Sequence, residues 1–343
     1  MIFAKQEYLA QLFDAGMPLI TSDHLQVRQH IATAWQTAFE KANELSAQAC
    51  AMLNPRFGEC MAAMIDCLFS IDAMSTGTLA SFSNSVSSTL EACDGANLRE
   101  PLLATCEGLY TKITAFAQSP NDGLNDEQKE TFLNHWCGTL QPCLVRLGDQ
   151  GVTDPVLEHL VALAVSTFRQ LRKVTSGGLF ILHGLTVTVG DRIAPHMATF
   201  MDYVLCALKM TDCDAMGTRV ACGLVSDLAN SLGDSINPSM PSIVPPLLAV
   251  LEDNTFDSEV KLIAIIAFGD ICLAAGPRNF QQYLPQTQQS LAQACSLSLG
   301  KGATPEEVDL LERLRIALVD AYISILHGLA PDGGSLQASP ASE

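Results

Sequence analysis

Apolar residues along most of this 343-residue chain recur at intervals of three and four, the spacing that places them on one face of an α-helix. We find no convincing run of alternating apolar and polar residues of the kind that predicts a β-strand. Start signals agree with this pattern: Asn125 precedes a turn rich in acidic residues, and Thr304 and Glu307 form a capping box around Pro305. The sequence therefore predicts an all-α protein. The expected helices cover residues 4–14, 24–47, 50–71, 77–92, 98–117, 126–147, 155–174, 177–189, 194–209, 214–232, 239–251, 258–275, 279–298 and 305–328.

Three glycines, Gly190, Gly233 and Gly276, lie 43 residues apart. They end the similar apolar segments LHGLTVTVG, LVSDLANSLG and AFGDICLAAG. A fixed period in the low forties carried by helices is typical of paired-helix repeats of the HEAT or armadillo kind, whose pairs stack because one pair cannot bury its own apolar face. We therefore predict an armadillo-like, HEAT-repeat, right-handed α-solenoid of about seven helix pairs. Gly233 and Gly276 are expected to adopt a left-handed conformation that ends each helix.

Charge narrows the range of partners. The chain has 37 Asp and Glu against 19 Lys and Arg, a net charge of −18. Such a surface repels phosphate backbones and attracts basic ligands, so direct binding of nucleic acid is not expected. The alternative interpretation is that the acidity serves only solubility.

The cysteines and the hydropathy of the chain indicate the cellular compartment in which the protein is expected. The twelve cysteines are scattered, mostly inside apolar stretches, and form no CxxC, so we expect free thiols in a reducing compartment. Charged residues interrupt the first sixteen residues, which do not look like an export signal. The most apolar uncharged run, 175–190, is shorter than the roughly 20 residues that a membrane span needs. We expect a soluble chain without membrane association.

Motifs of enzymes and metal sites are not found in the sequence. The seven histidines form no HxxxH or HxH, and GxGxxG, GxxxxGK[ST] and GxSxG do not occur. The two tryptophans, Trp35 and Trp136, lie in apolar stretches and are expected in the core. We therefore predict no catalytic residues, no metal, no cofactor and no enzymatic activity.

A family resemblance rests on the segment 217–329. Its sequences VACGLVSDLANSLGDSINPSMPSIVPPLLAVLED, SEVKLIAIIAFGDICLAAGPRNFQQYLPQTQQSLAQA and LERLRIALVDAYISILHGL resemble consecutive HEAT repeats of the C-terminal half of the importin-β (karyopherin-β) family. LVALAVSTFRQLRKV (160–174) is also similar to that family. The expected organisation is helical repeats of weak resemblance at 1–80, HEAT repeats at 81–174, HEAT repeats with the clearest resemblance at 175–329, and a disordered tail at 330–343.

The resemblance implies a nuclear transport receptor, of which this chain looks like an internal or truncated portion. Its implied partners are the basic segment of importin-α or a basic cargo, and nucleoporins with phenylalanine-glycine repeats. Its implied location is the cytoplasm and nucleus, at the nuclear pore. The family's N-terminal repeats, which bind Ran, have no counterpart here, so we do not expect Ran binding by this chain alone. The alternative is a generic HEAT scaffold, phosphatase-scaffold-like or an assembly factor, without nucleoporin binding.

Acidic residues at matching points of successive second helices are the first candidate site. Asp227 and Asp270 are 43 residues apart, and Asp320 continues the series at a longer spacing. In the family that the chain resembles, the second helices line the concave face, where such acids would meet Lys and Arg of a bound segment. The alternative, which we favour, is a structural ladder of hydrogen bonds between repeats.

The second candidate site lies between neighbouring first helices, where the resemblance implies slots for phenylalanine side chains. The candidate residues are Met197, Phe200, Tyr203, Ile243, Leu247 and Tyr283. The alternative for each is that it packs against its partner helix.

One junction departs from the period. RKVTSGGLF (172–180) joins two segments that both resemble second helices, so we expect about 25 residues, one helix and its turn, to be missing there.

Overall fold

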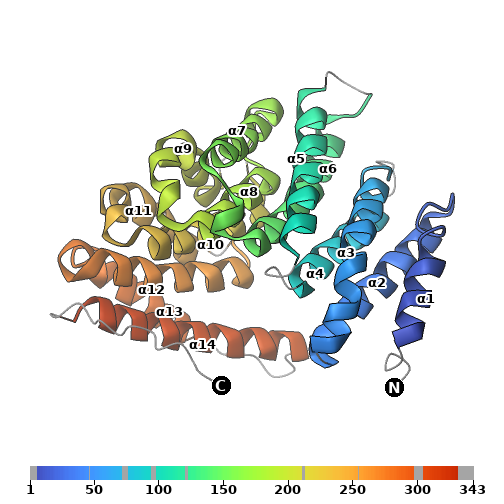
Figure 1. Ribbon diagram of the computed structural model, residues 1–343. Coiled ribbons are helices and arrows are strands. Elements are labelled where there is room, and N and C mark those ends of the chain that lie inside the picture. Colours follow the sequence, from blue (N-terminus) through green and yellow to red (C-terminus); the bar gives the residue numbers. More distant parts are fainter. Residues whose placement is uncertain are drawn as a thin grey trace. The chain divides into compact units, whose positions relative to one another are not determined.

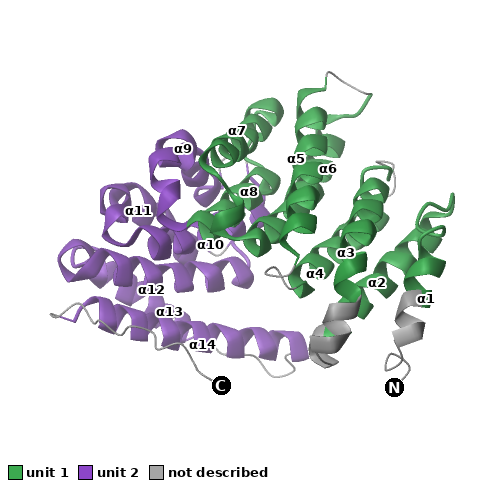
Figure 2. Ribbon diagram, viewed as in Figure 1, with its two compact units in different colours: residues 1–189 green, residues 190–343 purple. Residues whose placement is uncertain are grey.

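A computed structural model of the chain describes residues 6–45, 47–71, 76–93, 98–119, 123–210, 213–253, 255–296 and 304–330. The described residues form fourteen α-helices and three short 3-10 helices, with no strand among them. Two compact units divide the chain, residues 1–189 and 190–343 (Figure 2). The predicted all-α solenoid of about seven helix pairs is confirmed. The expected disordered tail lies almost entirely outside the described residues.

Unit 1 consists of four helix pairs (Figure 1). Each first helix packs on the next first helix, and each second helix packs on the next second helix, so the unit has two layers. The first helices are α1 (Gln6–Gly16), α3 (Ala47–Leu68), α5 (Arg99–Gln118) and α7 (Asp154–Leu171). The second helices are α2 (Leu25–Leu45), α4 (Thr76–Ala92), α6 (Asp126–Leu147) and α8 (Ser176–Val189).

Unit 2 repeats this arrangement with three pairs. The first helices are α9 (Met197–Leu208), α11 (Met240–Glu252) and α13 (Leu284–Cys295), and the second helices are α10 (Ala215–Leu232), α12 (Ser258–Phe280) and α14 (Pro305–Gly328). The 3-10 helices η3 (Gly190–His196) and η4 (Gly233–Ser239) lead into α9 and α11. Capping explains the helix starts: Asp214, Asp257 and Thr304 each accept a hydrogen bond from a backbone N–H of the first turn.

The junction 172–175 is a turn within one pair, so the prediction of a missing helix was wrong. Helix α7 packs on α5 as a first helix, and α8 packs on α6 as a second helix. The first helices from α7 onward start at residues 154, 197, 240 and 284, which keeps the period. A short loop suffices because Arg172 adopts a left-handed conformation (φ 53°, ψ 26°) that reverses the chain. Gly177 and Gly178 then fit closely, since a Cβ on Gly178 would lie 2.3 Å from the Phe168 ring.

The repeated glycines have positive φ, 59° at Gly190, 54° at Gly233 and 73° at Gly276. For Gly233 and Gly276 the predicted left-handed conformation is correct in the sign of φ but wrong in ψ. Gly233 has ψ −132° and Gly276 has ψ 173°, outside the left-handed helical region and close to a conformation that glycine alone adopts readily. Gly276 therefore interrupts α12 with a change of direction that a side chain would oppose.

Aromatic clusters form the core of unit 1. Trp35 stacks on Phe13, with ring centroids 5.8 Å apart, and Trp136 stacks on Phe69 (4.2 Å) and Phe132 (4.9 Å). Both tryptophans are buried, as predicted. Eight of the eleven cysteines in the described part of the chain are buried, and all eleven are free thiols. The eight buried cysteines serve as small apolar residues of the core.

Helix α12 is, among the described residues, the one helix long and apolar enough to cross a membrane by length and composition. It packs between α10 and α14, and 56% of its most apolar window is buried inside unit 2. Its hydropathy is that of a core helix of the stack, because a second helix in the middle of a solenoid is covered on several sides.

Candidate binding surfaces

The predicted acidic pair forms a contact between repeats in unit 2. The Ser226 hydroxyl of α10 donates a hydrogen bond to the Asp270 carboxylate of α12, and Asn230 bonds to the same group. Both Asp227 and Asp270 are half-buried. Burial raises the pKa of Asp270, and the negative charge of Asp227 adds to this shift. The structure therefore brings these two carboxylates together, and the Asp270 carboxylate joins α12 to α10 through its hydrogen bonds.

Asp320 does not join this pair. Its side chain on α14 is exposed, and the residues that meet α12 are its neighbours on the other face. Ala321 and Ser324 lie so close to Gly269 that a Cβ there would be 3.0 Å from the Ala321 Cα. The close crossing of α12 and α14 fixes this register, and the sequence spacing of 50 residues gave no sign of it.

Polar contacts between second helices recur in unit 1. The Gln29 amide of α2 donates to Ser81 Oγ of α4 (2.6 Å), and the hydroxyls of Ser83 and Thr139 share a hydrogen bond of 2.7 Å between α4 and α6. Between α6 and α8, the Gly177 N–H donates to Asn134 Oδ1 (2.8 Å). A hydrogen-bonded ladder within each unit is thus a property of the second-helix layer, as the structural alternative supposed.

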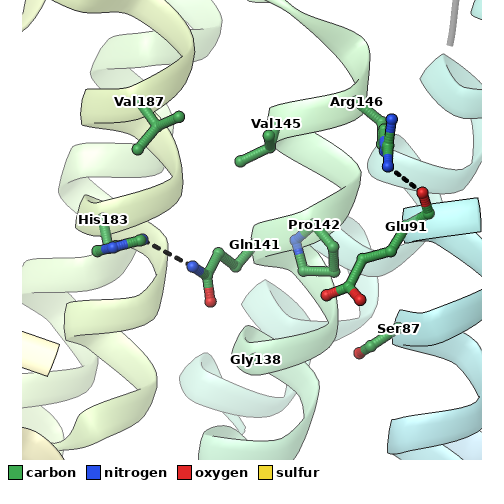
Figure 3. Close-up of a pocket in the computed structure, with 9 residues that line it drawn as sticks. All are labelled: Ser87, Glu91, Gly138, Gln141, Pro142, Val145, Arg146, His183 and Val187. Carbon is green, nitrogen blue, oxygen red and sulfur yellow. Dashed lines mark hydrogen bonds between the residues drawn. The ribbon is translucent and has the colours of Figure 1, made fainter. Parts of the chain in front are cut away.

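A hollow of about 530 Å³ opens along the second helices α4, α6 and α8. Figure 3 shows Val145 and Val187 facing each other across it, while the Gln141 amide donates to Nδ1 of His183 (2.6 Å). On the α4 side lies Glu91, whose main-chain carbonyl accepts a hydrogen bond from Arg146. The hollow combines two exposed valines with one carboxylate and one guanidinium, so it is amphipathic and not strongly acidic.

The expected nucleoporin residues of unit 2 divide into two groups. Phe200, Ile243 and Leu247 are fully buried, so they pack against neighbouring helices as the alternative supposed. Met197, Tyr203 and Tyr283 are half-exposed. The Tyr283 ring lies against Phe280, with 6.2 Å between ring centroids. Of the six candidates, these three are the side chains that solvent or a ligand can reach.

Two hollows between first helices of unit 1 were not found from the sequence. One of about 430 Å³ lies between α3 and α5, beside the ion pair of Lys112 and Asp66 (3.2 Å). Another of about 330 Å³ lies between α5 and α7 and is lined by Tyr110, Val156 and Leu160 among others. The sequence signal was present as small residues facing one another: Gly58, Ala62, Pro101, Ala104 and Gly108 all line the first hollow.

Groups able to bind a metal ion are not present in the described residues, where no three His, Cys, Asp or Glu side chains come together. Stacked helix pairs, with hydrogen bonds between second helices and hollows between first helices, define the class of protein: an α-solenoid, in which each helix pair packs on its neighbours.

Comparisons with known proteins identify the family. Residues 113–338 match the family described as Importin subunit beta-1-like, TPR repeats. The chain belongs to this family, whose members are nuclear transport receptors and not enzymes. The resemblance stated from the sequence is therefore confirmed.

Curated relatives give the extent of the likeness. The chain is 27% identical over 228 residues to importin subunit beta-1 of Schizosaccharomyces pombe, covering 65% of this chain and 26% of the relative. It is 27% identical over 212 residues to importin subunit beta-1 of Arabidopsis thaliana, covering 60% of this chain and 24% of the relative. The chain therefore spans about a quarter of the curated relatives that it matches.

Solved structures show the same fold. A crystal structure of importin beta in an ammonium sulfate condition matches with a TM-score of 0.70 at 18% identity, covering 94% of this chain and 42% of that chain. Yeast importin-beta (Kap95p) matches with a TM-score of 0.65, also at 18% identity, covering 96% of this chain and 42% of that chain. At this identity the likeness establishes the helical solenoid alone.

Proposed function

We propose that this chain is the binding part of an importin-β-type nuclear transport receptor. The observation that carries the proposal is the family match over residues 113–338, which includes helices of both units. The proposed ligand of the second-helix layer is a basic segment, either of importin-α or of a cargo. In support, the chain has a net charge of −18, and charge of this size attracts Lys- and Arg-rich ligands at long range. Its proposed location is the cytoplasm, the nucleus and the nuclear pore between them.

A titration with a basic peptide tests this proposal. A labelled Arg- and Lys-rich importin-α segment should bind, and its affinity should fall between low and near-physiological salt because the attraction is screened. The double substitution Asp227→Asn and Asp270→Asn should weaken binding if the pair faces the ligand. Asp191→Asn with Asp202→Asn is the control of equal charge change, since both acids are exposed and lie outside the second helices, Asp191 on η3 and Asp202 on α9.

The results separate the alternatives. Equal affinity at the two salt concentrations would remove electrostatic attraction as the mechanism. A double variant at Asp227 and Asp270 that unfolds, while the control variant folds, would assign the pair to the structural ladder alone. Failure of every basic peptide to bind would favour the generic HEAT scaffold.

Nucleoporin binding is the second part of the proposal. Phenylalanine side chains would enter the hollow between α5 and α7, where Tyr110, Val156 and Leu160 supply apolar walls, and the hollow between α3 and α5. In unit 2, the half-exposed Met197 and Tyr203 would receive them at the edge of α9, with Tyr283 beside α13. Contacts of this kind are individually weak, since one buried Phe contributes only about 1.5–3 kcal/mol before the entropic cost of binding.

Hydrogen exchange with a phenylalanine-glycine peptide tests this part. Protection is expected on α5 and α7 in the presence of peptide, and Val156→Gln should remove it. Val145→Gln is the matched control, because Val145 is a similarly exposed valine on a second helix. No protection on any first helix at about millimolar peptide, where weak single-site contacts would saturate, would contradict nucleoporin binding.

A further inference from the structure

Two cysteines of the third helix pair in unit 1 are in direct contact. Cys106 belongs to the first helix α5 and Cys143 to the second helix α6, and a hydrogen bond joins their side chains. The Cys143 thiol also donates to the Leu102 carbonyl, one turn before Cys106, with 3.6 Å between sulfur and oxygen. These contacts hold the Cys143 sulfur against the part of α5 that carries Cys106. We call Cys106 and Cys143 the α5–α6 thiol pair.

The two members of the thiol pair differ in access. Cys106 lines the hollow of about 330 Å³ between α5 and α7, whose lining also includes the exposed residues Val156 and His159. Cys143 has no exposed surface. A small molecule that enters the hollow therefore meets Cys106 and not Cys143.

The surroundings of Cys143 indicate which thiol reacts first. Its pKa is raised by the hydrogen bond with Cys106, by burial and by the nearby Cys93, which directly follows α4. A thiol with a raised pKa stays protonated and attacks an oxidant slowly, because the thiolate is the nucleophile. Reaction should therefore begin at Cys106. The cysteines here do not form a metal site, since no group of three suitable side chains occurs in the described part of the chain.

Oxidation of the thiol pair balances with one molecule of hydrogen peroxide. The Cys106 sulfur attacks one peroxide oxygen, the O–O bond breaks, the thiol proton leaves with the other oxygen as water, and Cys106 becomes a sulfenic acid. The Cys143 sulfur then attacks the Cys106 sulfur and forms the S–S bond. The hydroxyl group of the sulfenic acid leaves with the Cys143 proton as a second water. The two thiols have then lost two electrons and two protons to the peroxide.

Space around α5 allows the bond to close. An S–S bond of about 2.05 Å requires the two sulfurs to come closer than hydrogen-bond contact. Helix α5 has a hollow of about 430 Å³ towards α3 and one of about 330 Å³ towards α7. Open space resists a small shift less than close packing does. A side-chain rotation with a small movement of α5 can therefore join the two sulfurs.

We propose that Cys106 and Cys143 form a reversible disulfide when a hydroperoxide enters the hollow between α5 and α7. The proposal is independent of the proposed function, because the bond is measured in the chain itself. Reduced, folded protein is treated with hydrogen peroxide, the remaining thiols are blocked with N-ethylmaleimide, and the digested protein is analysed by mass spectrometry. Peptides joined through Cys106 and Cys143 should appear, and dithiothreitol should separate them.

Variants assign the reaction to the thiol pair. Cys106→Ala should abolish the cross-link, whereas Cys143→Ala should leave Cys106 as a sulfenic acid that dimedone labels. Cys137→Ala is the matched control, because Cys137 is a buried cysteine of the same helix α6, and the cross-link should form as in the wild type. In the wild type, the Cys106–Cys143 link should accumulate at least about tenfold faster than any link to Cys137. Circular dichroism checks that each variant is folded, and the wild-type time course tests the proposal without any variant.

Three results would overturn the proposal. The first is that Cys106 and Cys143 are both recovered as alkylated thiols while the exposed Cys295 is oxidised, which would show that peroxide does not reach the pair. The second is a link from Cys143 to Cys93, which would assign the reaction to a different pair. The third is a Cys106–Cys143 link that forms only in denaturant, which would show that the folded chain holds the two sulfurs apart.

Discussion

Substitution of Gly276 tests whether its backbone conformation, which glycine alone adopts readily, contributes to the stability of unit 2. Its backbone has φ 73° and ψ 173°, and a Cβ built on it would have no neighbour within 4 Å. A substitution there acts through backbone strain alone and not through crowding. Gly276→Ala should therefore destabilise unit 2 although alanine fits the space.

The magnitude follows from two opposing effects. Holding a residue other than glycine in this conformation costs about 1–3 kcal/mol. The loss of conformational freedom in the unfolded chain returns about 0.4–1 kcal/mol. The free energy of unfolding should fall by about 1–2 kcal/mol, which for a unit of roughly 150–250 residues lowers the melting temperature by about 2–4 °C per kcal/mol.

A matched substitution gives the opposite sign. Gly108 lies inside α5 with no neighbour within 4 Å of its missing Cβ, and it has no positive φ. Gly108→Ala should stabilise unit 1 by about 0.5–1 kcal/mol because alanine favours the helix. Both tryptophans are in unit 1, so their fluorescence follows that unit, while circular dichroism follows all helices. A Gly276→Ala protein that melts at or above the wild-type temperature, with Gly108→Ala behaving as expected, would refute the reasoning.

Three further predictions follow from single contacts. Burial raises the pKa of the Asp270 carboxyl above its usual 3.8, so its contribution to the free energy of unfolding is present at low pH and is lost as pH rises through the folded-state pKa. Asp270→Asn should therefore weaken the pH dependence of the melting temperature and should cost little stability at pH 7. Gly328→Ala should lower the melting temperature of unit 2, since its Cβ would strike the Cys272 carbonyl, and an unchanged melt would show that α14 can shift. Ellman's reagent should modify the exposed Cys295 first, whereas burial raises the pKa of Cys137 to about 12 and should protect it until unfolding.

Helix positions and repeat spacing could be predicted because they depend on local signals. Most expected helices agree with the observed ones within a few residues, since caps such as Thr304 and the glycines of positive φ act on their own neighbourhood. The error at residues 172–175 had a different origin. Helix α7 was assigned as a second helix because its segment resembles one, whereas its place in the stack depends on contacts with α5 that no local pattern records.

Site residues could be predicted less well for the same reason. The pairing of Asp227 with Asp270 followed from the repeat, and the structure places them together. Asp320 failed to join them because the crossing angle and register of α14 depend on Gly269 and Ala321, small residues that carry no signal of their own. Phe200 is fully buried. Its residue type could not show this, because an aromatic side chain is expected equally in the core and in a binding groove.

The two layers of unit 1 differ in how they resist bending. Second helices α6 and α8 are in close contact at Gly177 and Gly184, and hydrogen bonds join each second helix to the next. First helices α3, α5 and α7 instead have hollows of about 430 and 330 Å³ between them. Close packing is hard to compress, whereas an open hollow can narrow or widen at low cost. The hollow of about 530 Å³ along α4, α6 and α8 does not loosen the second helices in the same way, because hydrogen bonds join each of them to the next. Unit 1 should therefore bend mainly by changing the spacing of its first helices, while the spacing of its second helices stays nearly constant.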